Sequence, residues 1–170
     1  MGEEELGKED ILKIFYTTPG GLDRINAVID ARLAEGRTRS ITLFEKFIRA
    51  RLEVNPKVLK MPNSDITAVE AVYLSQYPGV REVEILDLRQ NHFGDVGLDA
   101  LVNSPHLKNL RALDLRNNQI TRVGLESLAR ADTLAHLETL DLRLNKVGKR
   151  WEDKLRASEK LPALATVRVV

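Results

Sequence analysis

The 170-residue sequence predicts an α/β fold, in which short parallel strands alternate with helices in a right-handed solenoid. Three observations lead to this prediction. A block of about eight residues recurs every 27 residues in the C-terminal two thirds of the chain, apolar and polar residues alternate inside each copy, and the first 57 residues lack the repeat. Stacked units of fixed length produce such a period, because each unit buries its apolar face only against its neighbours.

The first two helices are expected on either side of a turn. Residues 8–16 and 22–33 place apolar side chains at helical spacing, so that each segment has one apolar face. Residues 17–21 contain a proline and two glycines and separate the two helices. The turn lacks the Gly-Lys-Ser or Gly-Lys-Thr continuation of a phosphate-binding loop, so we assign it no phosphate site.

A third helix is expected after a break at Gly36. Thr42 and Glu45 have the spacing of a capping box and would mark its first turn. Its predicted apolar face consists of Leu43, Phe44, Phe47, Ile48 and Leu52. The basic residues of the same stretch are Arg37, Arg39, Lys46, Arg49 and Arg51. We interpret them as a solvated helix face, because nucleic-acid binding requires more positive charge and aromatic side chains that are free to stack.

The repeats are expected over residues 58–170, so that residues 1–57 form an all-helical cap at one end of the stack. Three copies are regular and begin the pattern Leu-Asp-Leu-Arg-x-Asn at Leu86, Leu113 and Leu140. Counting 27 residues back and forward reaches Leu59 and Val167, which indicates a degenerate copy at each end. The sequence therefore predicts five parallel strands joined by helices.

Alternation within a copy separates core residues from surface residues. Leu86 and Leu88 are expected to point inward, while Ile85, Asp87 and Arg89 point to the opposite face. The equivalent positions of the other copies should form columns that run across the sheet.

The asparagine that ends each regular block has a predicted structural role. Asn91, Asn118 and Asn145 are expected to form a ladder, because an amide both donates to and accepts from backbone groups that a turn leaves unpaired. Gly97 and Gly124 occupy equivalent positions and indicate a close backbone approach where each return helix begins.

The last regular copy departs from the pattern after its asparagine. Trp151 stands where the other copies have glycine, and Glu152 replaces a leucine, which favours a capping role for this helix. The apolar strand at residues 167–170 would then be the edge of the stack. Exposed edges of this kind pair readily with another chain, so a homodimer through the C-terminal edge is one hypothesis for self-association.

The concave face carries the candidate binding residues in three columns. The first column is Val58, Ile85, Ala112, Thr139 and Thr166, the second is Lys60, Asp87, Asp114, Asp141 and Arg168, and the third is Pro62, Arg89, Arg116, Arg143 and Val170. Neighbouring carboxylates about 4.8 Å apart repel one another, and the adjacent arginines are expected to offset this repulsion. One interpretation is a duplicated motif whose surface pairs each contribute about 0–1 kcal/mol. The functional interpretation is a polar docking surface that comprises Lys60, Ile85, Asp87, Arg89, Asp114, Arg116, Asp141, Arg143 and Arg168.

Composition narrows the remaining possibilities. The formal charge of +1 predicts no attraction to nucleic acid, and the absence of cysteine excludes disulfides and thiolate ligands. His92, His106 and His136 fall at unrelated positions of the repeat, so no metal or other cofactor is expected. The acidic first residues do not resemble a secretory signal and no apolar run could span a membrane, so we expect no membrane association and a cytoplasmic location.

The repeated block resembles the leucine-rich repeat family, and most closely its ribonuclease-inhibitor-like class. Residues 104–110, Ser-Pro-His-Leu-Lys-Asn-Leu, followed by the block at Leu113, are similar to repeats of many bacterial proteins of this class. The resemblance covers about residues 58–170 and implies helices on the convex side and protein binding through the concave face.

Two hypotheses for function follow. The first is a non-enzymatic module that binds an as yet unidentified protein through the concave face. The alternative is a structural or assembly role, with copies joined by the C-terminal edge or the N-terminal helices. An enzyme is not expected, because no nucleophile–base pair, metal-ligand spacing or phosphate loop is present.

Overall fold

A computed structural model describes residues 6–33 and 39–170. The helices are α1 (Lys8–Thr17), α2 (Leu22–Leu33), α3 (Ile41–Val54), α4 (Ala68–Gln76), α5 (Gly94–Val102), α6 (Arg122–Arg130) and α7 (Arg150–Arg156), with a short 3₁₀ turn, η1 (Pro78–Val80). The strands are β1 (Val58–Lys60), β2 (Ile85–Asp87), β3 (Ala112–Asp114), β4 (Thr139–Asp141) and β5 (Thr166–Arg168). The expected break at Gly36 and the basic residue Arg37 lie outside the described residues.

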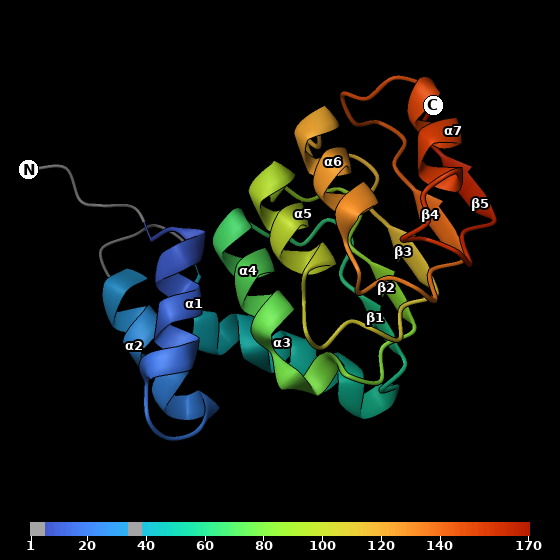
Figure 1. Ribbon diagram of the computed structural model, residues 1–170. Coiled ribbons are helices and arrows are strands. Elements are labelled where there is room, and N and C mark those ends of the chain that lie inside the picture. Colours follow the sequence, from blue (N-terminus) through green and yellow to red (C-terminus); the bar gives the residue numbers. More distant parts are fainter. Residues whose placement is uncertain (1–5, 34–38) are drawn as a thin grey trace, which may run out of the picture.

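The five strands form one parallel sheet in the order β1-β2-β3-β4-β5. Leu59 pairs with Leu86, and the 27-residue register continues through every strand to Val167. Helices α4, α5 and α6 lie side by side along the opposite side of the molecule, and α7 continues the series beside β5 (Figure 1). The predicted α/β solenoid is therefore confirmed, with strands on the concave side and helices on the convex side.

Alternation along each strand produces the core. The inward-pointing leucines of the regular copies are buried, as are the apolar residues of the return helices that face them. Gly97 permits the approach of α5 to α4, because a Cβ at this position would lie 2.5 Å from the Phe93 Cβ and 2.9 Å from the Ala71 Cβ. The close approach predicted from the repeated glycines is thus present.

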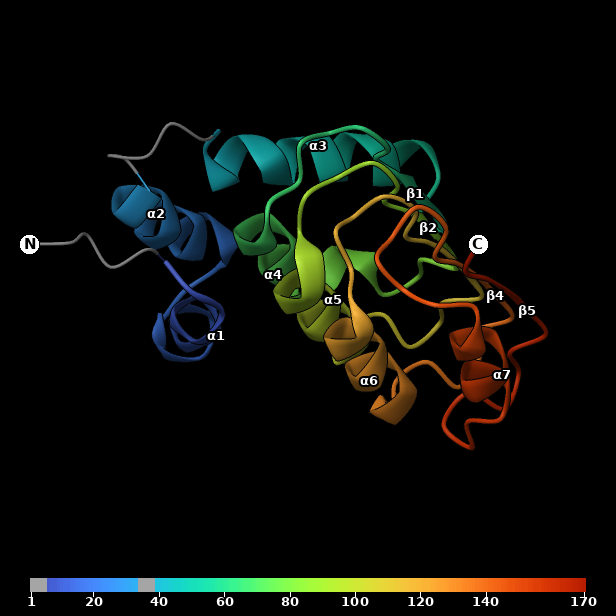
Figure 2. The same ribbon diagram turned by 90° about the horizontal axis from the view of Figure 1, so that it is seen from above.

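The three N-terminal helices cover the β1 end of the stack. Helix α3 packs against β1 and α4, and α1 packs against α4, as Figure 2 shows from above. Polar contacts cross this junction: Tyr73 Oη donates to Asn26 Oδ1 at 2.7 Å, and Tyr77 Oη donates to the buried Glu45 at 2.9 Å. The residues of α4 from 70 to 75 are all buried as a result.

The start of α3 differs from the prediction. Ser40 is the N-cap, and its hydroxyl accepts from the Leu43 N–H at 3.1 Å. Thr42 is turned toward Asp30 of α2, and Glu45 is buried against Arg49 and Tyr77, so the predicted capping box of Thr42 and Glu45 is wrong.

The predicted apolar face of α3 was also too wide. Phe44 and Ile48 are buried and Leu52 is partly buried, but Leu43 and Phe47 are exposed on the outer side of the helix. Ile41, which precedes the predicted stripe, is buried in their place.

The β5 end of the stack is closed by α7. Trp151 is buried, so its expected role as a cap or core residue is in agreement with the structure. Glu152 Oε1 accepts from the Val169 N–H at 3.1 Å. A carboxylate therefore occupies part of the strand edge at the position where other copies place an inward leucine.

Candidate functional site

The concave face presents the predicted columns in register. On neighbouring strands, Lys60 of β1 lies opposite Asp87 of β2, Asp87 lies opposite Asp114 of β3, and Asp114 lies opposite Asp141 of β4. Arg168 is opposite Asp141 on β5 and completes the second column. The strands thus hold a row of three carboxylates with a cation at each end.

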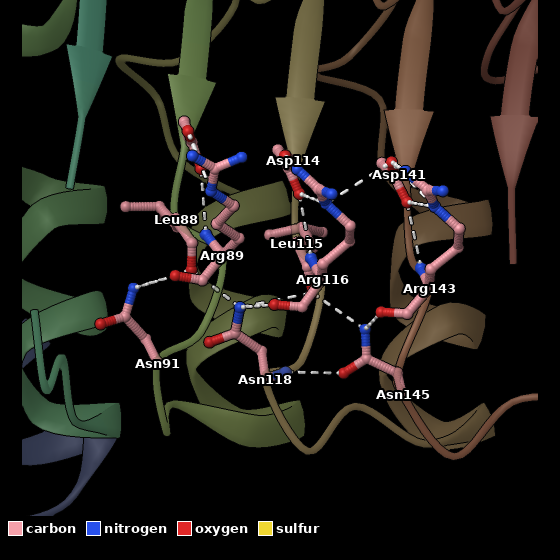
Figure 3. Close-up of polar contacts among 11 residues, drawn as sticks. Leu88, Arg89, Asn91, Asp114, Leu115, Arg116, Asn118, Asp141, Arg143 and Asn145 are labelled. Carbon is pink, nitrogen blue, oxygen red and sulfur yellow. Dashed lines mark hydrogen bonds and ion pairs between the residues drawn. The ribbon is translucent and has the colours of Figure 1, made fainter. Parts of the chain in front are cut away.

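The arginine that follows each aspartate pairs with it. Arg116 binds Asp114 with two N–H groups, at 2.6 and 3.0 Å, and its Nε lies 3.6 Å from Asp141 on the next strand. Arg143 binds Asp141 in the same forked manner, at 2.7 and 3.0 Å. Figure 3 shows these two pairs side by side at the ends of β3 and β4. Each aspartate also accepts from the backbone N–H two residues later, at 3.2 Å.

The pair on β2 is looser than the other two. Arg89 Nε lies 3.6 Å from Asp87 Oδ2, and the hydrogen bond at Asp87 comes from the backbone N–H of Arg89 at 3.2 Å. The repeated motif therefore produces two forked ion pairs and one guanidinium that is only loosely held.

Hydrogen bonding favours the charged forms of three groups in the lattice. Partial burial opposes ionisation of Asp141, but hydrogen bonds from the side chain and backbone of Arg143 outweigh burial and lower the pKa of the Asp141 carboxyl. Hydrogen bonds with Asp114 and Asp141 raise the pKa of Arg116 and Arg143, respectively. Asp141, Arg116 and Arg143 are therefore ionised near neutral pH.

An open hollow of about 330 Å³ runs along the columns across all five strands. Its charged wall consists of Lys60, Asp87, Asp114, Asp141 and Arg168, and its other wall includes Ile85, Ala112, Thr139 and Thr166. Ile85 is the exposed large apolar side chain of this wall. The hollow brings together six of the predicted site residues, Lys60, Ile85, Asp87, Asp114, Asp141 and Arg168. The other three, Arg89, Arg116 and Arg143, lie beyond the ends of β2, β3 and β4 (Figure 3).

The asparagine ladder lies below the arginines and fixes the turns. Asn91 Nδ2 donates to the carbonyl oxygens of Leu88 and Met61 at 2.7 and 3.1 Å, and its Oδ1 accepts from the N–H groups of Ser64 and Ile66 at 3.0 Å. Asn145 bonds in the same way to the preceding copy. Each asparagine thus connects its own turn to the turn before it.

The middle rung is incomplete. Asn118 Nδ2 donates as in the other copies, but its buried Oδ1 has no hydrogen-bond partner among the described residues. The cause is the loop after β2. In the copies that contain Asp65 and Gln119, these residues are the second of the turn to have a positive φ. In the copy that begins with β2 the second such residue is Gly94, which lies two positions later in the repeat, and its N–H donates to the Asn118 carbonyl oxygen.

A second hollow, of about 310 Å³, was not predicted from the sequence. It lies beside the arginine column and is lined by Arg116, Arg143, Leu144, Asn145, Val147, Val169 and Val170. Leu144 has φ 62°, a positive value like those of the equivalent residues Asn63, Gln90 and Asn117, and the residue is 76 % exposed. The replacement of a polar residue by leucine at this position of the repeat was the available signal.

Two other kinds of site receive no support from the described residues. Within residues 6–33 and 39–170, no group of three or more histidine, cysteine, aspartate or glutamate side chains is arranged to hold a metal ion. In the same ranges, no helix has both the length and the apolar character needed to cross a bilayer.

Comparison with known proteins agrees with this geometry. Residues 83–102, 106–129 and 133–150 each match the family model described as leucine-rich repeat. The chain therefore contains leucine-rich repeats, and its fold is a short leucine-rich-repeat solenoid. The repeats matched in this way include β2, β3 and β4, which carry the acid–base pairs.

A solved structure titled leiomodin-1 actin-binding site 2 shares the fold, with a TM-score of 0.55 and 20% sequence identity over 74% of this chain and 78% of that chain. Among curated proteins, none matches this sequence.

Proposed function

We propose that this protein is a non-enzymatic interaction module that binds a partner protein through the concave face of its sheet. The observation that carries the proposal is the acid–base lattice, in which β2, β3 and β4 hold charged side chains at fixed spacing beside an open hollow. Rigid strands position such groups before a partner arrives, which reduces the entropy lost on binding. Complementary charges then contribute mainly to specificity and to the rate of association.

The relatives support the class of function rather than a named partner. Leucine-rich repeats present extended concave surfaces that suit protein binding. The leiomodin-1 structure carries an actin-binding title, so a solenoid of this layout is associated with protein binding there. We extend only the general class, protein binding, to this chain.

The alternative is a structural role in which copies assemble through the C-terminal edge or the N-terminal helices. Pairing at the edge requires free backbone donors and acceptors on β5. Glu152 already accepts the Val169 N–H, so this edge has one donor fewer to offer another chain. For this reason we favour the concave face as the docking surface.

A charge swap tests the proposal without changing the net charge. In the variant Asp114→Arg with Arg116→Asp the ion pair is reversed, so the column is altered while the pair can re-form. The matched control reverses Glu126 and Arg130, an exposed pair one helical turn apart on α6 of the convex side. Wild type and both variants would be immobilised and exposed to lysate of the source cells, and bound proteins would be quantified by mass spectrometry.

We expect a partner that wild type and the α6 control retain equally and that the concave variant loses. Equal retention by all three proteins would place the binding surface elsewhere. Recovery of the native copy of the bait as the main product would favour assembly. Circular dichroism and urea unfolding of each variant establish that the comparison is between folded proteins.

A further inference from the structure

The cations and carboxylates of the concave lattice differ in exposure, and this difference bears on what can bind the face. In each ion pair the guanidinium is more exposed than the carboxylate. The side-chain exposures are 40% for Arg89 against 13% for Asp87, 27% for Arg116 against 22% for Asp114, and 36% for Arg143 against 18% for Asp141. The guanidiniums are therefore more accessible to an approaching molecule than the carboxylates, and they lie beside the hollow that the carboxylates line.

Three of the cations also have unused hydrogen-bonding capacity. Lys60 and Arg168 are exposed, and neither lies within 4.0 Å of a carboxylate in the part of the chain that the structure describes. Arg89 approaches Asp87 only to 3.6 Å and makes no side-chain hydrogen bond with it. Arg116 and Arg143, in contrast, are each engaged in a forked pair.

The second and third concave columns together contain five cationic and three carboxylate side chains. The formal charge of the whole chain is only +1, so the excess of positive charge is local to this face. A lattice of this composition is complementary to negative charge, although the repeated aspartates alone would indicate the opposite.

We propose that the concave face binds an extended acidic segment of a partner protein. Its carboxylates would reach Lys60 at one end of the hollow, with Arg89 beside that end, and Arg168 at the other end. This inference rests on the proposed function and specifies the partner. A peptide suits the site better than a nucleic acid, because none of the described residues that line the hollow is an aromatic residue for base stacking and Ile85 offers an aliphatic contact.

The spacing of the strands sets the length of the segment. Lys60 and Arg168 are four strand spacings apart on the sheet, which corresponds to about 19 Å. An extended chain advances about 3.3 Å per residue. The two acidic positions of the partner should therefore be about six residues apart, with small or aliphatic residues between them that contact the wall formed by Ile85 and its neighbours.

The test is a selection from a random twelve-residue peptide library displayed on phage. The target variant combines Lys60→Gln, Arg89→Gln and Arg168→Gln, which removes the three cations that are not engaged in forked pairs. The control combines Lys13→Gln, Lys108→Gln and Arg122→Gln, which removes three exposed cations of the helices and loops away from the concave face. Enriched peptides would then be synthesised and titrated against all three proteins by fluorescence anisotropy.

We expect wild type to enrich peptides with two acidic positions about six residues apart. Binding to the target variant should be about ten- to hundredfold weaker, because each exposed ion pair that is lost accounts for about two- to fivefold. The control should bind as wild type does. Binding should also weaken when the ionic strength is raised from 0.05 to 0.5 M, since the contacts are exposed to solvent.

The failures of the two proposals are distinguishable. Peptides that require Asp114 and Arg116, as judged by the reversed-pair variant, but carry no acidic excess would overturn the acidic-partner inference and leave concave binding standing. Tighter binding of a single-stranded oligonucleotide of the same charge would overturn the assignment to a protein partner. Absence of enrichment on wild type, or equal enrichment on all variants, would overturn both proposals.

Discussion

Removal of the Asn91 side chain should destabilise the fold more than removal of Asn118, although the two residues are equivalent in the repeat. In Asn91→Ala the buried Ile66 N–H loses its acceptor and the buried Met61 carbonyl oxygen loses its donor. The Ser64 N–H also loses its acceptor but is only partly buried. Each buried group left without a partner costs about 1–3 kcal/mol, so we expect a loss of about 2–6 kcal/mol in the free energy of unfolding.

In Asn118→Ala every acceptor keeps another donor. The carbonyl oxygen of Leu88 still receives Asn91 Nδ2, that of Leu115 still receives Asn145 Nδ2, and that of Arg116 still receives the Gln90 N–H. The substitution also removes the unpaired Asn118 Oδ1. We therefore expect a loss of only about 1 kcal/mol, the net contribution of an ordinary hydrogen bond.

Urea unfolding followed by circular dichroism measures both effects. The midpoint concentration should fall further for Asn91→Ala than for Asn118→Ala, while the slope of free energy against urea stays that of wild type. Equal losses for the two variants, or a larger loss for Asn118→Ala, would refute the reasoning that the incomplete rung contributes little. A changed slope would mean that the substitution altered the extent of folding rather than one set of hydrogen bonds.

Three further predictions concern packing, backbone strain and pH. Gly97→Ala should lower the free energy of unfolding by about 1–3 kcal/mol through overpacking. At Gly148 an added Cβ would meet none of the described residues within 4 Å, so Gly148→Ala should leave the free energy of unfolding unchanged or raise it by up to about 1 kcal/mol. Equal urea midpoints for the two variants would contradict this. Leu144→Asn should raise the free energy of unfolding by about 1 kcal/mol, because asparagine tolerates positive φ better than leucine does. A melting temperature lower than that of wild type would count against backbone strain at this residue. The pKa of Asp141 is lowered in the folded state, so the stability that Asp141 contributes is present above its unfolded pKa of about 3.9 and is lost as pH falls through the folded pKa. The difference in free energy of unfolding between wild type and Asp141→Asn, measured by urea titration, should therefore shrink below about pH 4.

Periodicity was sufficient to predict the sheet. The 27-residue spacing places Leu59 and Val167 in register with the regular copies, and both are paired as expected. The alternation of leucine with charged residues likewise identifies the concave columns. These features are predictable because a repeat imposes the same local geometry on every copy, so a degenerate copy inherits its position from regular neighbours.

Features that depend on a single contact could not be predicted in this way. Ser40 and Thr42 are both suitable N-caps by sequence, and only the position of Asp30 on a neighbouring helix draws Thr42 away. The greater exposure of Arg89 relative to Asp87 depends on side-chain conformation rather than on spacing. The hydrogen bond from the Val169 N–H to Glu152 links the altered helix of the last regular copy with the final strand. The sequence shows each of these two departures from the repeat but not the contact between them.

The two ends of the solenoid are held with unequal strength. At the β1 end, α3 and α1 bury α4 on several sides, whereas the β5 end depends on the seven residues of α7, which include Trp151. In a linear array with only nearest-neighbour contacts, opening starts at the weaker end and spreads inward. Amide protons of β5 should therefore exchange with solvent before those of β1. Arg168 lies on β5, the strand that opens first, so a ligand that spans the whole sheet would slow amide exchange most at β5. The affinity of such a ligand would be reduced by the fraction of molecules in which β5 is open.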